Sequence, residues 1–143
     1  MASLLPQDYE LVPVGLLHLH PENPRQGDVG AIHDSITANG FYGALVVQRS
    51  SGHVLVGNHR LQAAAHAGVE ELPVIWVDVD DDRARRIMLA DNRSGDLASY
   101  DEAALVDLLS ELAGTEEGLA GTAWDGDELD RLLRQAEPPE GFR

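Results

Sequence analysis

Residues 54–60 constrain the fold more than any other part of the chain, because an apolar run there passes through one glycine into a helix-favouring stretch. The run Val54-Leu55-Val56 is short and rich in β-branched residues, which favours a strand. Residues 58–67 favour a helix, with Asn58 as the expected N-cap and Gly68 just beyond the end. A strand that leads directly into a helix predicts an α/β protein.

Three further segments are expected to supply the rest of the sheet. Residues 44–48 and 53–56 are separated by a short polar segment and predict a β-hairpin. Residues 72–79 are apolar nearly throughout, which predicts a strand buried on both faces. Residues 9–19 alternate weakly and contain Pro13, so they predict an edge strand, where proline is tolerated.

The expected helices divide the chain into two parts. In the first part, residues 29–39 have apolar side chains at helical spacing, and residues 80–92 begin with three aspartates that suit a helix N-terminus. After Leu97 no further strand is expected. The helices expected there are residues 100–112 and 127–135, with a glycine-rich linker at 114–122 and a frayed tail from Pro138. We therefore expect a domain at residues 1–97 and a helical extension at residues 98–143.

Charge and composition exclude several classes of protein. The chain has 25 acidic and 10 basic residues, a formal net charge of −15, no lysine and no cysteine. The extension at 98–143 is the more acidic part, with twelve acidic residues against three arginines, a net charge of −9. Such an acidic chain is not suited to non-specific binding of DNA or of a membrane surface. Without cysteine it has no thiol chemistry. No apolar run is long enough to span a membrane, and the acidic N-terminus does not resemble a secretory signal, so a cytoplasmic location is expected.

Three polar clusters lie at expected strand or helix ends. Gly57 and Arg60 flank a helix N-terminus, where free backbone N–H groups attract anions, and glycine lets a phosphate approach closely. Arg25 offers a second guanidinium on a proline-bounded loop. Asp91 and Asn92 offer a carboxylate and an amide, and Asp91 could hold Mg²⁺ together with phosphate oxygens. Taken singly, these clusters also suit a tight turn, a salt bridge and a helix C-cap; taken together, they predict a nucleotide site.

Two histidines, His18 and His20, lie one residue apart on the expected edge strand. With no third ligand nearby in the sequence, they are expected to be ordinary surface or capping histidines rather than metal ligands.

In order and spacing, these motifs resemble those of the ParB/sulfiredoxin superfamily, and specifically the ParB-like N-terminal domain. The resemblance covers about residues 11–97. Its anchors are Asn23-Pro24-Arg25, residues 39–47, which resemble an "NG..PLVV" segment, and residues 57–64, which resemble a "GERRxRAA" box. The resemblance implies a compact domain with a small mixed sheet. It also implies a site for a nucleotide such as CTP or ATP with Mg²⁺, in which Arg25, Gly57, Asn58, His59, Arg60 and Asn92 bind phosphate and Asp91 binds the metal.

The differences from the family pattern narrow the expected activity. Asn58 and His59 replace the Glu and the first Arg of "GERR", and Ser94 and Gly95 replace the Gln and Arg of "ENxQR". Asn58 also stands where sulfiredoxins have cysteine, which excludes sulfinic-acid repair. Residues 98–143 are too few for the DNA-binding and dimerisation domains of partition proteins, so a complete partition protein is not expected. The weaker similarity of this tail suggests a stand-alone ParB-like protein of phage or mobile-element type.

Two functions of different classes remain open. The first is a nucleotide-binding protein of DNA metabolism, and if it is an enzyme, a nucleotide triphosphatase or a magnesium-dependent nuclease with His59 and Asp91 as catalytic residues. DNA contact would then be weak or local. The second is a non-catalytic adaptor of ParB-like fold, whose acidic helical tail docks onto a protein partner.

Overall fold

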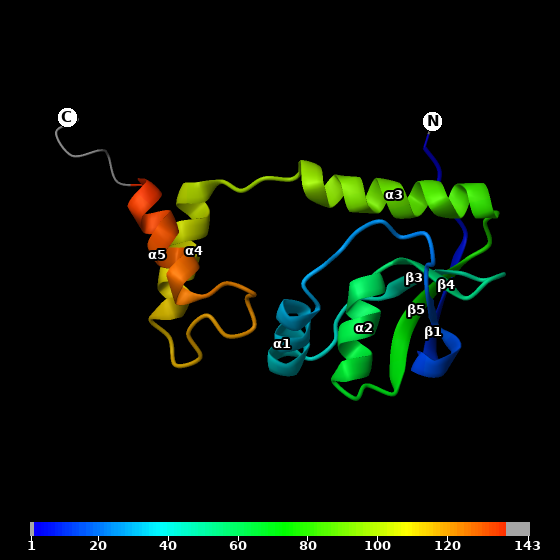
Figure 1. Ribbon diagram of the computed structural model, residues 1–143, viewed down its shortest axis with the longest axis horizontal. Coiled ribbons are helices and arrows are strands. Elements are labelled where there is room, and N and C mark those ends of the chain that lie inside the picture. The colour runs from blue at the N-terminus through cyan, green and yellow to red at the C-terminus, as the bar shows by residue number, and fades with distance from the viewer. Residues whose placement is uncertain (1, 137–143) are drawn as a thin grey trace. The chain divides into compact units, whose positions relative to one another are not determined.

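A five-stranded mixed sheet occupies the N-terminal part of the computed structural model, which describes residues 2–136 (Figure 1). The strand order is β1-β5-β3-β4-β2. The pairs β1/β5 and β3/β4 are antiparallel, whereas β3/β5 and β2/β4 are parallel. The strands are β1 (Gln7–Pro13), β2 (His18–Leu19), β3 (Leu45–Gln48), β4 (His53–Val56) and β5 (Glu71–Val77). The predicted α/β class, the mixed sheet and the β3/β4 hairpin are confirmed.

The single edge strand predicted at residues 9–19 is wrong, because this segment forms two strands at opposite edges of the sheet. The strand β1 ends at Pro13, which has no N–H to extend the ladder. A 3₁₀ turn, Val14–Leu16, redirects the chain, and β2 then pairs with β4 at the far edge. The turn buries Leu17 in the core, and this tertiary contact is not visible in a local alternation pattern.

Helices cover the two faces of the sheet. The helices α1 (Val29–Asn39) and α2 (Asn58–His66) lie side by side in Figure 1, and residues of both belong to the larger core cluster. This cluster contains Leu45, Val47, Val54, Leu72 and Val74, none of them accessible to solvent. The helix α3 (Asp81–Leu97) packs through Ala84 against the opposite face, where Leu55 and Val77 form a second cluster. The strand β5 is thus flanked by apolar contacts on both faces.

The start of α2 corrects one prediction. Gly57, not Asn58, is the N-cap, and its backbone is left-handed with φ of 100°. Asn58 is the first residue of the helix and makes no side-chain cap hydrogen bond. The C-terminal end of α1 lies where the sequence predicts it. Gly40 follows Asn39 with φ of 82°, and its N–H donates to the carbonyl oxygen of Ile36.

The helix α3 continues to Leu97, five residues beyond the predicted end at Asn92. Asp80 caps its first turn by accepting from the N–H of Arg83 at 2.8 Å. Asp91 and Asn92 therefore lie inside the helix and not at a C-cap. The last turn also makes a tertiary contact, an ion pair of 3.4 Å between Asp96 and Arg25. Gly95, which weakens a helix by its backbone freedom, is tolerated there because Arg25 packs over it.

One buried glutamine joins the sheet to the beginning of α3. Gln48 is 1% exposed, and its Nε2 donates to the carbonyl oxygen of Val79 and to Oδ1 of Asp81, each at 3.0 Å. Its Oε1 accepts from Oγ of Ser51 at 2.6 Å. All the polar atoms of this side chain are bonded, as burial requires.

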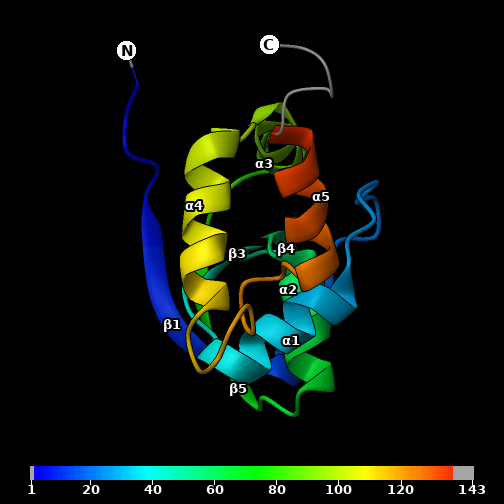
Figure 2. The same cartoon turned by 90° about the vertical axis from the view of Figure 1, so that its left-hand side faces the viewer.

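The second unit, Ala98–Arg143, is described only to residue 136 and contains two helices that lie side by side (Figure 2). These are α4 (Glu102–Ala113), capped by Asp101, and α5 (Gly126–Ala136). A reciprocal pair of bonds between Asp125 and Glu128 starts α5 as a capping box. The predicted frayed tail from Pro138 lies outside the described residues. In the part of the chain that the structure describes, no helix is long and apolar enough to cross a membrane.

Candidate anion-binding site

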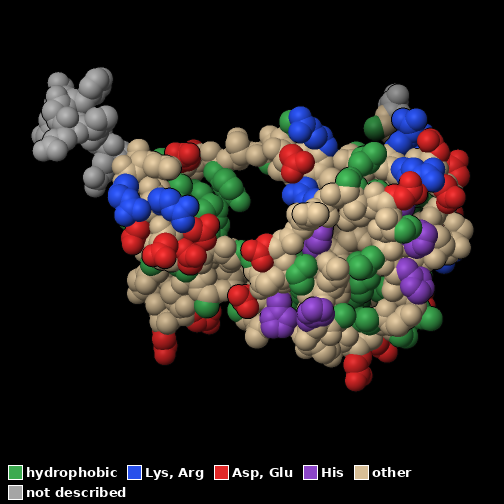
Figure 3. Space-filling model, viewed as in Figure 1, with side chains coloured by type: hydrophobic (Ala, Val, Ile, Leu, Met, Phe, Trp, Pro, Cys, Tyr) green, Lys and Arg blue, Asp and Glu red, His purple; other side chains and the backbone are tan. Residues whose placement is uncertain are grey.

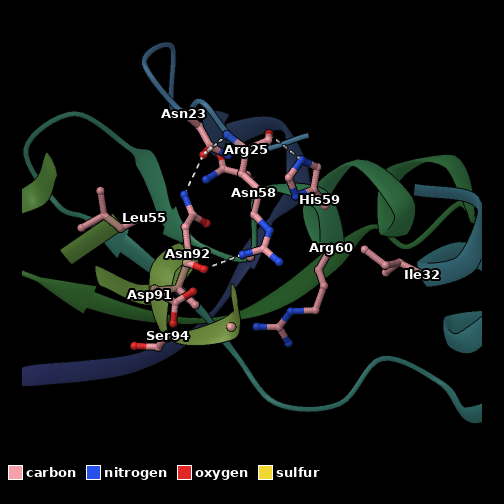
Figure 4. Close-up of a pocket in the computed structure, with 13 residues that line it drawn as sticks. Asn23, Arg25, Ile32, Leu55, Asn58, His59, Arg60, Asp91, Asn92 and Ser94 are labelled. Atoms are coloured by element: carbon pink, nitrogen blue, oxygen red, sulfur yellow. Dashed lines mark hydrogen bonds between the residues drawn. The ribbon is translucent and has the colours of Figure 1, made fainter. Parts of the chain in front are cut away.

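A cavity of about 570 Å³ with a mixed polar and apolar lining lies in the N-terminal unit, at the beginning of α2 (Figure 4). Its walls come from α1, α2 and α3, from the end of β4, and from residues 20–28, the segment between β2 and α1, which we call the arginine loop. The lining residues are Asn23, Arg25, Ile32, Leu55, Val56, Gly57, Asn58, His59, Arg60, Asp91, Asn92, Ser94 and Gly95.

The N-terminus of α2 supplies backbone donors to this cavity. The first intrahelical bond runs from the N–H of Leu61 to the carbonyl oxygen of Gly57, so the N–H groups of Asn58, His59 and Arg60 have no partner within the helix. Gly57 is required at the cap for two reasons. Its φ of 100° is costly for other residues, and a Cβ there would overlap the Cδ2 atom of Leu45.

The arginine loop brings Arg25 onto α3. Its Nη1 donates to the carbonyl oxygen of Asn92 at 2.7 Å and lies 3.4 Å from Oδ1 of Asp96. Asn92 also donates from Nδ2 to Oδ1 of Asn23 at 3.1 Å, and the same oxygen accepts from the N–H of Arg25 at 3.2 Å. The Arg25 side chain is 39% exposed, so the guanidinium keeps donors that face solvent and the cavity.

His59 holds the loop from the side of α2. Its Nε2 lies 3.1 Å from the carbonyl oxygen of Arg25, and because a carbonyl can only accept, Nε2 must carry the proton. The ring packs on Gly27, where a Cβ would come within 2.7 Å of two ring atoms. His59 is therefore engaged with the loop backbone.

Arg60 is held by the segment that leads into β3. Nη1 donates to the carbonyl oxygen of Tyr42 at 3.2 Å, and Nη2 donates to that of Ala44 at 3.0 Å. The guanidinium carbon lies 5.5 Å from the centre of the Phe41 ring, a cation–π distance. Burial lowers the pKa of Arg60, while Tyr42 and Asp91 raise it, and an arginine remains charged under all ordinary conditions. These two carbonyl oxygens thus take two of its five N–H donors.

Asn58 lines the cavity by position, but its side chain bonds to protein groups. It is 7% exposed, its Oδ1 accepts from the N–H of His20 at 2.8 Å, and its Nδ2 donates to the carbonyl oxygen of Val54 at 2.9 Å. His20 itself is 8% exposed and its Nδ1 accepts from the N–H of Glu22 at 3.1 Å, so of the two expected roles, surface or capping, this residue has the capping one. Its ring lies 5.2 Å from that of His53.

Asp91 supplies the one carboxylate among the residues lining the cavity. Within residues 2–136, no group of three or more His, Cys, Asp or Glu side chains is arranged to hold a metal ion. A cation here would thus have a single protein carboxylate, which suits Mg²⁺ because this ion keeps most of its waters and takes ligand oxygens from phosphates.

The predicted site residues therefore come together. Arg25, Gly57, Asn58, His59, Arg60, Asp91 and Asn92 all line the same cavity. Sequence reasoning missed Asp96, which pairs with Arg25, because α3 was expected to end before it. It also missed the carbonyl oxygens of Tyr42 and Ala44, because backbone acceptors leave no signal in residue types.

Comparison with known proteins agrees with this architecture. A model of the ParB N-terminal domain matches residues 9–93. The probable plasmid-partitioning protein ParB of Thermus thermophilus is 33% identical over 108 residues, which cover 72% of this chain and 36% of that protein. The chain thus spans little more than a third of this relative.

Two solved structures of the C-terminally truncated chromosome-partitioning protein ParB from Caulobacter crescentus share the fold. The one complexed with CTP-gamma-S gives a TM-score of 0.75 at 21% identity, over 93% of this chain and 81% of that one. The one complexed to the centromeric parS site gives a TM-score of 0.52 at 20% identity, over 92% of this chain and 74% of that one.

The mixed sheet, the glycine-capped helix α2 and the cavity at its start define a small α/β domain, as the sequence predicted. The match over residues 9–93 makes the assignment specific: the chain belongs to the ParB N-terminal domain family.

Proposed function

We propose that the cavity at the start of α2 binds the phosphates of a nucleotide, with CTP as the first candidate and ATP as the second. One observation carries the proposal: three independent sources of donors, the N-terminus of α2, Arg25 and Arg60, line a single cavity. They do so in a chain with a net charge of −15, where a gathering of positive groups is unusual. Helix N-termini and arginine forks are the groups that proteins use for phosphates.

The size of the cavity supports a ligand larger than a simple anion. About 570 Å³ lies in the range of small-molecule sites, which start near ~300 Å³. The ParB of Caulobacter crescentus, whose fold this chain shares, was solved in complex with CTP-gamma-S, which supports a cytidine nucleotide as the first ligand to test.

Asp91 is the residue proposed to hold Mg²⁺ beside the phosphates, where the ion would neutralise their charge. Hydrolysis of a nucleotide or of a nucleic-acid phosphoester is a finer form of the proposal, with Asp91 and His59 as its catalytic residues. His59 would have to give up its hydrogen bond to the carbonyl oxygen of Arg25 to move a proton at Nε2. Binding therefore ranks before hydrolysis.

The test is calorimetric titration of the whole chain with CTP, ATP and ADP in the presence of Mg²⁺. Arg60→Ala should weaken binding by about tenfold or more, because it removes a charged donor from the cavity. Arg93→Ala is the matched control, since Arg93 lies on α3 but does not line the cavity. Absence of binding by all three nucleotides would reject the proposal, and phosphate release measured in the same samples tests hydrolysis.

A second candidate function rests on the helical extension. In α4 and α5, Leu109 and Leu129 are buried, whereas Leu108, Leu112 and Leu133 are 60%, 40% and 41% exposed. Figure 3 shows acidic side chains around these helices. We propose that this surface docks onto a protein partner with basic and apolar side chains. Loss of co-purifying proteins on Leu108→Ser in the full chain, with Ser110→Ala as control, would support docking, and unchanged capture would contradict it.

A further inference from the structure

The side chain of Asn58 is placed where it cannot meet a ligand with its acceptor oxygen. Oδ1 already accepts from the N–H of His20, 38 residues earlier in the chain, and the side chain is 7% exposed. Nδ2 donates to the carbonyl oxygen of Val54, the residue four positions before it on β4. Both polar atoms of the amide are thus used to join α2 and β4 to the beginning of the arginine loop.

From His20, hydrogen bonds continue through the loop toward Arg25. Nδ1 of His20 accepts from the N–H of Glu22 at 3.1 Å, and its carbonyl oxygen accepts from the N–H of Asn23 at 3.2 Å. Oδ1 of Asn23 then accepts from the N–H of Arg25 at 3.2 Å. A succession of short-range bonds therefore connects Asn58 to the backbone of Arg25.

We propose that Asn58 is a positioning residue: through His20 it fixes the arginine loop to the beginning of α2 and so holds Arg25 at the cavity. The proposal rests on the proposed function for its effect on ligand binding, but its structural part concerns the ligand-free protein. It replaces the expectation that the Asn58 side chain contacts phosphate.

The geometry explains why an amide is suited to this position. The N–H of His20 requires an acceptor and the carbonyl oxygen of Val54 requires a donor, and asparagine presents both on one short side chain. A carboxylate could satisfy only the first of these groups. Because the two bonds are buried, the loss of either leaves a polar group without a partner, which is costly.

Positioning of this kind has an effect distinct from stability. Arg25 is partly exposed and bonds to α3 through Nη1, so a loosened loop would let the guanidinium sample positions away from the cavity. A ligand would then have to order the loop on binding. Its apparent affinity would be the intrinsic affinity multiplied by the fraction of molecules in which the loop is already in place.

The test compares amide hydrogen exchange in the ligand-free protein with CTP affinity. Asn58→Ala should speed exchange at His20, Glu22, Asn23 and Arg25 by about tenfold, a factor typical of one lost hydrogen bond, while the core strand β5 exchanges as before. CTP affinity should fall by a similar factor. Asn39→Ala, an exposed change at the end of α1, is the control and should alter neither quantity.

Asn58→Asp distinguishes a role in positioning the loop from a role in stability alone. The carboxylate keeps the acceptor for the N–H of His20 but lacks the donor to Val54, so the loop should remain protected even if the protein is less stable. Unchanged loop exchange in Asn58→Ala would overturn the proposal, as would equally fast exchange in both variants or loss of the whole fold in both. If the wild type binds none of CTP, ATP and ADP, the proposed function fails, but the exchange comparison still decides the role of Asn58.

Discussion

Arg25 and Asn92 are joined by a hydrogen bond of 2.7 Å from Nη1 to a backbone carbonyl oxygen, although 67 residues separate them in the chain. The bond attaches the guanidinium of a loop residue to the backbone of α3, away from the ends of that helix. A carbonyl oxygen inside a helix normally accepts from the N–H four residues later, so this one accepts a second donor. The arrangement brings the loop and the helix to the same cavity, where they meet the end of β4.

Arg25→Lys should weaken CTP binding by about tenfold or more, because one ammonium cannot replace a planar fork that contacts both α3 and an anion. Calorimetric titration measures the change. Arg93→Lys is the control: Arg93 lies on α3, outside the cavity, and this change should leave the affinity unchanged. Equal affinity of Arg25→Lys and the wild type would mean that Arg25 does not contact the ligand.

Gly57→Ala should lower the free energy of unfolding by roughly 2–4 kcal/mol, the sum of a left-handed backbone penalty and an overlap with the Leu45 side chain. Urea denaturation followed by circular dichroism provides the measurement. Gly15→Ala is a suitable comparison, because Gly15 has no positive φ and no atom within 4 Å of an added Cβ, and its effect should be small. Similar losses for both variants would show that neither constraint acts at Gly57.

Arg60→Lys should lower stability by roughly 1–3 kcal/mol even without ligand, because the carbonyl oxygens of Tyr42 and Ala44 lose charged donors. The Phe41 ring also loses its stacked guanidinium. Thermal and urea unfolding would detect the change. A variant as stable as the wild type would show that these bonds contribute little to stability. The role of Arg60 would then be in ligand binding alone.

Stability should fall as the pH is lowered from about 6.5, the ordinary pKa of histidine, because of His20. Burial lowers the pKa of His20 in the folded chain, and His53 and Arg85 lower it further, while Glu22 and Asp81 act in the opposite direction. The unfolded chain therefore binds the proton more readily, so the contribution is complete above pH 6.5 and is lost below it. Protonation would also place a hydrogen on Nδ1, against the N–H of Glu22.

The measurement is urea unfolding between pH 7.5 and 5.5. His20→Asn should flatten the profile, since an amide oxygen can accept in place of Nδ1 without titrating. His66→Gln, an exposed change at the end of α2, should leave the slope as it is. A wild-type profile that stays flat over this range would remove His20 as a source of pH dependence.

An element can be predicted from the sequence when the residues that determine it are neighbours in the chain. The strand, Gly57 and α2 follow one another directly, so backbone preference and hydrophobic pattern suffice to predict them. The splitting of residues 9–19 into two edge strands depends on Leu17 reaching a core built from distant strands. The last turn of α3 pairs with Arg25, 71 residues before Asp96, and no local window of sequence shows such a contact.

The site shows the same division. Charged and glycine residues at element ends predicted which side chains gather, and the cavity contains all of them. Their individual tasks were less visible, since Asn58 faces inward and His59 holds a loop carbonyl. Residue type records the chemistry that a side chain offers, while the partner that it meets is set by the whole fold.

The two ends of α3 are attached to the rest of the first unit in different ways, and Gln48 is buried at the first of them. Its bonds to Val79 and Asp81 fix the first turn to the sheet, whereas the last turns are attached to the arginine loop through Arg25, whose side chain is 39% exposed. A ligand that drew the Arg25 guanidinium toward its phosphates would take a partner from Asp96 and leave the first turn in place. Occupancy of the cavity would thus change the contacts of the last turn of α3 and leave those of its first turn as they are.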